Sequence, residues 1–369
     1  MKKKNLILIA VAVAVAIAAA VIAIVGSRST TIEQDYHIAD TGSITKVFLA
    51  DKENGHVLLQ RVDSTHWVVD SVLPANQPLV DLLLETLREM RIRQQVNKNA
   101  IPNTIKDLSA HGIKVEVYQR VYRINWFGGS IRLFPHEKRT VTYYVGRETQ
   151  DMMGSFMYRK GDKVPYIIHI PGFRGFLTPR FVTDPLKWRS HTVVSLNVRQ
   201  IQRVELEIPA MQEESFAIVS NGQGFDFEKL STHQRMNGFD TARVAQMLAS
   251  FNNLCFDEFA AIVPNTFADS CVAGTPKAIL RVTDTAGVTT ELKSYIKYTN
   301  PADLQNMPDK NMYETFDLNR LYAVVSGGSD RKSVNASGND TVLIQYFIFD
   351  NILQPASYFL GADKSAFAK

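Results

Sequence analysis

Residues 76–90, NQPLVDLLLETLREM, and residues 240–254, DTARVAQMLASFNNL, carry the same pattern of apolar side chains 164 positions apart. The spacing i, i+3, i+4, i+7 predicts a helix with one buried face in each stretch. The equivalent apolar positions are Val80 and Val244, Leu83 and Met247, Leu84 and Leu248, Leu87 and Phe251, and Met90 and Leu254. Asn76 and Asp240 are the predicted N-terminal caps, again 164 residues apart. Two copies of one structural unit are therefore expected.

Short predicted strands precede the two helices in the same order. They cover residues 47–50, 56–61 and 67–69 in the first half, and residues 204–208, 216–219 and 225–227 in the second. Residues 44–47 match residues 201–204 at a shift of 157. The dipeptides Asn54-Gly55 and Asn221-Gly222 predict hairpin turns at similar places in the two halves.

Strands are also predicted after the helices. Residues 113–117 alternate apolar with polar side chains, as residues 278–282 do at a shift of 165, and residues 166–170 and 345–349 are predicted apolar strands. The predicted fold class is α+β: an N-terminal transmembrane helix, then two similar units, each an antiparallel or mixed sheet with one principal packed helix. We expect the anchor in residues 1–28, the first unit in residues 29–190 and the second in residues 191–369.

Residues 6–25 are twenty consecutive apolar residues, preceded by Lys2, Lys3 and Lys4. At about 1.5 Å per residue, a helix of this length crosses a hydrocarbon core of about 30 Å. The lysines favour a cytoplasmic N-terminus. We therefore expect a single-pass protein of the inner (cytoplasmic) membrane with the bulk of the chain in the periplasm. A cleaved signal peptide is the alternative.

Charge and cysteine content narrow the classes of partner and compartment. Three of the four net positive charges are the N-terminal lysines, so nucleic acid is not an expected partner of the remaining chain. The two cysteines, Cys255 and Cys271, are candidates for a disulfide in an oxidising compartment. Two buried thiols are the alternative.

No motif in the sequence predicts catalysis. Phosphate-binding loops, the G-x-S-x-G nucleophile turn and the H-E-x-x-H zinc motif are absent, and the eight histidines are scattered singly. The adjacent acids Glu213-Glu214 and Asp257-Glu258 point in different directions on either a strand or a helix. We therefore predict no catalytic residue, no metal site and no cofactor.

Residues 165–190 interleave aromatic and basic side chains on a loop shaped by proline and glycine. The candidate interaction residues are Phe173, Arg174, Phe176, Arg180, Trp188 and Arg189. Such residues are enriched where proteins bind partners, and they also suit anionic groups or lipid headgroups. Because this loop lies immediately before the second unit, the favoured interpretation is that it joins the two units and that its aromatic rings fill the seam between them.

The order of these features resembles the uncharacterised "domain of unknown function 4340" family. The resemblance rests on residues 44–47 (ITKV), 67–69 (WVV), 74–76 (PAN), 79–83 (LVDLL) and 165–173 (PYIIHIPGF) with Trp188-Arg189. It covers most of the first unit and, more weakly, the second. Some members occur fused or next to gliding-type ABC-transporter components as membrane-anchored accessory subunits. The resemblance therefore implies a role of that kind.

The functional hypothesis is a non-enzymatic, membrane-anchored accessory or scaffold protein with an envelope protein as its partner. The resemblance implies that a transporter belongs to the assembly. Two alternatives from other classes stay open: an envelope hydrolase with a site between the units, and a lipid- or small-molecule-binding module. A deep apolar cavity would favour lipid binding, and a broad exposed patch with aromatic and Arg residues would favour a partner.

Overall fold

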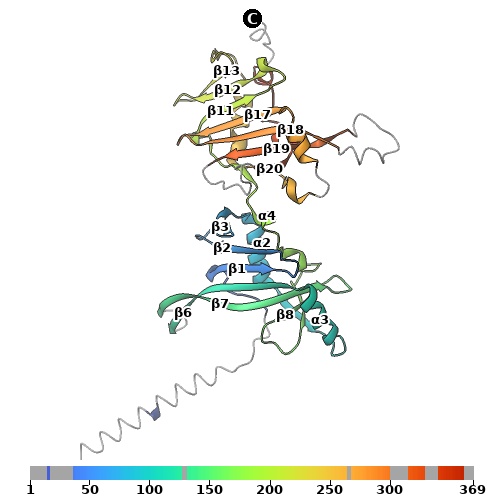
Figure 1. Ribbon diagram of the computed structural model, residues 1–369. Coiled ribbons are helices and arrows are strands. Elements are labelled where there is room, and N and C mark those ends of the chain that lie inside the picture. Colours follow the sequence, from blue (N-terminus) through green and yellow to red (C-terminus); the bar gives the residue numbers. More distant parts are fainter. Residues whose placement is uncertain are drawn as a thin grey trace, which may run out of the picture. The chain divides into compact units, whose positions relative to one another are not determined.

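The computed structural model describes residues 15–16, 36–126, 131–263, 267–299, 315–328 and 340–360. Over these residues the chain is an α+β protein with two large antiparallel sheets of nine strands each and a few short helices (Figure 1). It divides into two compact units, residues 1–56 with 81–183 and residues 57–80 with 184–369. This division runs through the first sheet, because strands near residues 57–80 are grouped with the second unit.

The predicted membrane anchor lies almost entirely outside these residues. Of residues 6–25 only Val15 and Ala16 are described, and both are helical and exposed. In the part of the chain that the structure describes, none of the helices has the length and the hydrophobicity that a membrane span requires. The anchor therefore stays a prediction.

The first sheet has the strand order β4-β3-β2-β1-β6-β7-β8-β9-β5. Its strands are β1 (Ile44–Ala50), β2 (His56–Arg61), β3 (Trp67–Val69), β4 (Leu73–Pro74), β5 (Arg91–Gln95), β6 (Ile113–Trp126), β7 (Ile131–Glu148), β8 (Ser155–Arg159) and β9 (Tyr166–His169). The helices that accompany it are α2 (Gln77–Glu89) and α3 (Ile101–His111), with short 3-10 turns η1 (Thr41–Ser43) and η3 (Thr178–Arg180). Strands β2 and β3 have the predicted bounds.

The second sheet has the strand order β14-β13-β12-β11-β17-β18-β19-β20-β16. Its strands are β11 (Ile201–Glu207), β12 (Phe216–Ser220), β13 (Phe225–Lys229), β14 (Arg235–Met236), β16 (Glu258–Phe259), β17 (Ala278–Asp284), β18 (Thr289–Tyr298), β19 (Phe316–Gly327) and β20 (Asp340–Gln345). Its helices are α4 (Pro185–Trp188), α5 (Thr241–Ser250), α6 (Ala268–Val272), α8 (Tyr346–Phe349) and α9 (Ala356–Phe359). Strands β10 (Thr192–Val194) and β15 (Leu254–Cys255) form a separate pair.

The two sheets have the same strand order. Each strand of the first sheet has a counterpart at the same place in the second, for example β1 and β11, or β6 and β17. At the centre of the first sheet Val47 pairs with Val117, and at the centre of the second Val204 pairs with Val282. These pairs reproduce the shifts of 157 and 165 found in the sequence. Both ladders also have a register irregularity two residues into the strand, after Ile44 and after Ile201. The local backbone of the two sheets therefore matches down to this irregularity.

The predicted helix faces are buried against the sheets. In α2 and α5 the equivalent pairs Val80 and Val244, and Leu83 and Met247, are buried. Leu87 in α2 and Phe251 just beyond α5 are buried too, as are Met90 and Leu254. The fifth pair differs, because Leu248 is buried whereas Leu84 is half-buried. The Asp240 carboxylate accepts hydrogen bonds from the amides of Ala242 and Arg243, as expected of an N-terminal cap.

One strand prediction was wrong. Residues 345–349 were expected to form an apolar strand, but the strand β20 ends at Gln345 and Tyr346–Phe349 form helix α8. Phe349 is buried whereas Phe347 is 88% exposed. A run of four or five apolar residues fits either structure, so its composition alone did not decide between them.

Candidate interaction surfaces

The six residues predicted as one interaction surface fall into two groups. Trp188 and Arg189 are buried, with 0% and 6% of their surface exposed. Phe173 and Arg174 are exposed, whereas Phe176 and Arg180 are half-buried. The structure therefore does not bring all six residues onto one surface. We call the exposed and half-exposed group, Phe173, Arg174, Phe176 and Arg180, the loop surface.

The buried group forms an ionic cluster in the second unit. The guanidinium of Arg189 donates to both carboxylate oxygens of Asp340, at 2.8 Å and 3.3 Å. It also lies 4.5 Å from the ring centroid of Phe259. Asp340 is 5% exposed. A bidentate pair with this little exposure fixes the backbone around Arg189 and is not available to a partner.

The backbone next to this cluster is also held in place. Helix α4 begins after Asp184, whose carboxylate accepts a hydrogen bond from the amide of Leu186 at 2.9 Å. The carbonyl of Trp188 accepts a hydrogen bond from the amide of Asn76 at 2.6 Å. Trp188 therefore has a structural role in the core.

The loop surface is held in shape by a stacked pair. The guanidinium of Arg180 lies 4.5 Å from the ring centroid of Phe173 and donates a hydrogen bond to the buried hydroxyl of Thr86 at 2.9 Å. Gly175 has a φ of +154°, and a Cβ at this position would lie 2.9 Å from the ring of Phe173. The loop thus needs glycine at position 175 to present the aromatic ring in this position.

Polar groups lie at the edge of the first sheet formed by strand β5. The guanidinium of Arg93 on the edge strand β5 donates to the carboxylate of Asp151 at 2.7 Å. The hydroxyl of Thr149, and then Arg93, lower the pKa of Asp151 to about 2. Partial burial, and then Arg93, lower the pKa of His169 below its ordinary value. This edge therefore carries fixed charge at neutral pH, with His169 in its neutral form.

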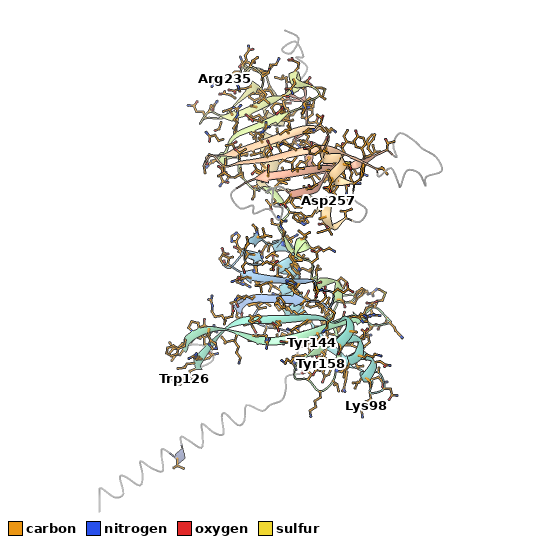
Figure 2. The ribbon with its side chains drawn as sticks, viewed as in Figure 1. Lys98, Trp126, Tyr144, Tyr158, Arg235 and Asp257 are labelled. Atoms are coloured by element: carbon orange, nitrogen blue, oxygen red, sulfur yellow. The ribbon has the colours of Figure 1, made fainter. Side chains whose placement is uncertain are left out.

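The sequence did not predict a second exposed surface, on the hairpin of β6 and β7. These strands extend beyond the neighbouring strands of the sheet as a two-stranded ribbon (Figure 1). We call residues 120–126 and 131–136 the arm. Four of its large apolar side chains are exposed: Trp126 by 60%, Ile131 by 40%, Leu133 by 47% and Phe134 by 64%. Figure 2 shows Trp126 at the far end of the arm, away from Tyr144 and Tyr158 on the sheet.

The arm has one apolar face. Partners across an antiparallel ladder project to the same side, and the pairs along the arm are Tyr122 with Pro135, Ile124 with Leu133, and Trp126 with Ile131. The alternate positions carry Arg123, Asn125, Arg132 and His136, together with Val121 and Phe134. Residues 120–136 contain three arginines and no acidic residue. The arm is therefore amphipathic and positively charged.

The second sheet has a short turn where the first has the arm. Asp284 at the end of β17 is the counterpart of Gln119, because they pair with Ile201 and Ile44 respectively. Only residues 285–288 separate β17 from β18. The second sheet thus has the same strand order without an arm. The arm is therefore not required for this sheet topology.

The described part of the second unit also contains an apolar cavity of about 680 Å³. Its walls include Ile208, Met211, Cys271, Ile296, Tyr298 and Leu353. Cys271 is buried in α6, whereas Cys255 lies half-buried in β15, and the two are not joined in a disulfide. The size and lining of the cavity are those of small-molecule sites.

The described residues contain no group of three or more His, Cys, Asp or Glu side chains that could hold a metal ion. His191 stacks on Phe256 and lies 3.9 Å from the carboxylate of Glu258, and burial lowers the pKa of its imidazole. His191 is therefore packed among aromatic side chains, as is typical of a histidine in a protein core.

Comparison with known proteins agrees with the resemblance seen in the sequence. The family model described as "Domain of unknown function (DUF4340)" matches residues 67–272, more than half of the chain. No curated protein and no solved structure matches the chain. The matched region extends from strand β3 to helix α6 and so includes the arm and the loop surface. The chain therefore belongs to the DUF4340 family.

Proposed function

We propose that the protein is a non-enzymatic accessory or scaffold subunit of a membrane assembly and that it recognises a partner protein through the loop surface. The observation that carries the proposal is the stack of Phe173 on Arg180 beside the exposed Arg174. Aromatic and Arg side chains are the residues that most often dominate binding energy at protein interfaces.

Preorganisation strengthens this proposal. The bond of Arg180 to Thr86 and the glycine at position 175 hold the exposed ring before a partner arrives. An interface residue that is already ordered loses little conformational entropy on binding. Phe173 is therefore suited to act as an anchor side chain.

The proposal includes a single N-terminal membrane span and a tandem organisation of the exported chain. The span is supported by the twenty apolar residues and the preceding lysines. The tandem organisation is supported by the common strand order and by the matching registers of the central strand pairs. A transporter as the partner complex is supported by what the family resemblance implies.

The proposal is tested with the full chain in its native membranes. A photoreactive residue at position 173 is expected to form an adduct with one partner protein, and Arg174→Ala is expected to reduce the adduct at least tenfold, as for an interface anchor worth about 1.4 kcal/mol. Arg235→Ala is the matched control, because Arg235 is an exposed arginine on the second sheet (Figure 2). Gly175→Ala, which displaces the ring, is expected to act like Arg174→Ala.

Two outcomes of these experiments would contradict the proposal. Adducts that persist unchanged in Arg174→Ala and Gly175→Ala would show that recognition does not use the loop surface. Recovery of the chain in the soluble fraction after carbonate washing would contradict the membrane span.

A second candidate function is binding of a lipid or another small apolar molecule. The cavity of about 680 Å³ in the second unit favours it, because apolar ligand pockets have this size. Gently purified protein is then expected to retain a stoichiometric apolar molecule, measured by mass spectrometry of the extract. Ile296→Trp, which fills the cavity, is expected to abolish retention, and an empty wild-type protein would exclude this function.

A further inference from the structure

We propose that the arm rests on the surface of an anionic lipid bilayer, with its apolar face toward the acyl chains and its arginines among the phosphate groups. This inference rests on the membrane span of the proposed function. It assigns the arm a ligand of its own, distinct from the protein partner of the loop surface.

The two faces of the arm match the two layers of a bilayer surface. Trp126, Ile131 and Leu133 are exposed although they belong to an apolar face, and the described residues leave this face open to solvent. Trp is favoured where hydrocarbon meets headgroups because its ring is apolar and its N–H is polar. An amphipathic element with such a face lies in the plane of the interface.

The charge of the arm selects an anionic surface. Arg123 and Arg132 are exposed, and no acid lies between residues 120 and 136 to neutralise them. Arg120 is also exposed and pairs across the ladder with Glu137. Each Arg near an anionic membrane contributes about 1 kcal/mol, which corresponds to about a fivefold change in the equilibrium constant for docking. The long Arg side chains can also reach phosphates while their stems cover apolar groups.

The length of chain before the first sheet keeps the arm within reach of the membrane. Ten residues, 26–35, separate the predicted anchor from Tyr36, and a fully extended chain of that length spans at most about 35 Å. The seven residues of its first strand, 120–126, make the arm roughly 23 Å long. The segment between the predicted anchor and the first sheet is therefore short enough for the arm to reach the membrane surface.

The backbone of the arm gives an independent sign of function. Phe134 has a φ of +56°, a left-handed conformation that is unfavourable for a bulky residue, and its side chain is 64% exposed. Burial of the ring therefore does not compensate for this strain in the free protein. Strained residues of this kind concentrate at binding sites.

Tryptophan fluorescence of the full chain in vesicles tests the inference directly. The protein has three tryptophans, and Trp67 and Trp188 are 3% and 0% exposed, so Trp126 is the one that lipids can reach. In vesicles of phosphatidylcholine and phosphatidylglycerol, brominated lipids are expected to quench the Trp126 emission and acrylamide is expected to lose access to it. Trp126→Phe should remove the lipid-quenched component and leave the rest unchanged.

Charge and arm variants complete the experiment. Arg123→Gln with Arg132→Gln is expected to lower the ratio of lipid-contacting to free arm about 25-fold in anionic vesicles, as two independent fivefold steps. The effect should vanish in vesicles of phosphatidylcholine alone. Replacing residues 120–137 by Thr285-Ala286-Gly287, the turn of the second sheet, should abolish lipid contact while the protein still folds.

Each result distinguishes this inference from the proposed function. A chain that carbonate releases from the vesicles would refute the membrane span. A chain that stays embedded while Trp126 remains open to acrylamide and is not quenched by brominated lipid would refute lipid docking alone. A photoreactive residue at position 133, on the apolar face, that labels a protein rather than lipid in native membranes would also overturn it.

Discussion

Removing either member of the Arg189–Asp340 pair should destabilise the protein strongly. Both side chains are almost fully buried and joined by two hydrogen bonds. Asp340→Asn leaves the guanidinium without its counter-charge, and Arg189→Met leaves the carboxylate without its own. Breaking a buried pair in this way typically costs about 3–5 kcal/mol of the free energy of unfolding. At 1.4 kcal/mol per tenfold, the folding equilibrium constant should fall by at least about 100-fold.

The double variant tests the cause. Arg189→Met combined with Asp340→Leu removes both charges, and we expect its stability to lie within about 1 kcal/mol of the wild type, because no unpaired charge remains. Glu137→Gln is the control, since Glu137 pairs with Lys46 at 2.8 Å on an exposed part of the first sheet. Such surface pairs contribute about 0–1 kcal/mol.

Urea unfolding of the full chain in detergent measures these changes. The transition is followed by near-ultraviolet circular dichroism and by tryptophan emission, to which the buried Trp188 beside Arg189 contributes. An unchanged m-value shows that the variants alter stability and not the extent of unfolding. Our interpretation is refuted if Asp340→Asn changes stability no more than Glu137→Gln does, or if the double variant loses as much as the two single variants together.

Three further predictions concern the cores of the two units. Leu248→Ala should cost about 2–5 kcal/mol and Leu84→Ala less, because only Leu248 is fully buried; equal losses in urea unfolding would contradict this. Burial lowers the pKa of His191 despite the nearby Glu258, so stability should fall as pH drops below about 6.5, and His191→Gln should flatten this slope. Burial, followed by a hydrogen bond to a carboxylate, raises the pKa of Tyr36 far above its ordinary value. Because the unfolded chain ionises first, stability should fall above about pH 10, and a Tyr36→Phe protein with the same alkaline slope would exclude this cause.

Local patterns allowed much of the fold to be predicted. Strands β2 and β3 were found with their bounds because turn residues flank short alternating runs. The correspondence between the two sheets was visible because equivalent strands follow in the same order, at shifts that change only from 157 to 165. The arm was missed because the prediction of β6 stopped at Val117, where the register with β1 is nearly complete. The arm would have been found by counting the residues from Val117 to the following hairpin turn and comparing that number with the count from Val282 to its own turn.

The candidate site was predictable only in part, because burial depends on residues far away in the sequence. Trp188 and Arg189 have the composition of an interface, but Asp340 pairs with Arg189 from 151 positions away. Arg180 likewise bonds to Thr86, 94 positions earlier. No local pattern reports such partners. An aromatic–basic segment therefore indicates a set of candidates, and the tertiary contacts decide which of them are exposed.

The pairing at the centre of each sheet has a consequence for the order of folding. Val47 pairs with Val117 and Val204 with Val282, so each sheet joins two meanders whose central strands are synthesised 70 and 78 residues apart, respectively. Until β6 emerges, β1 is a bare edge that other chains can pair with, and the same holds for β11 until β17 follows. High contact order of this kind slows folding. At a synthesis rate of about 5–20 residues per second, the edges of β1 and β11 each stay unpaired for several seconds. A nascent chain of this protein therefore has two successive periods of aggregation risk, in which a chaperone would have most effect.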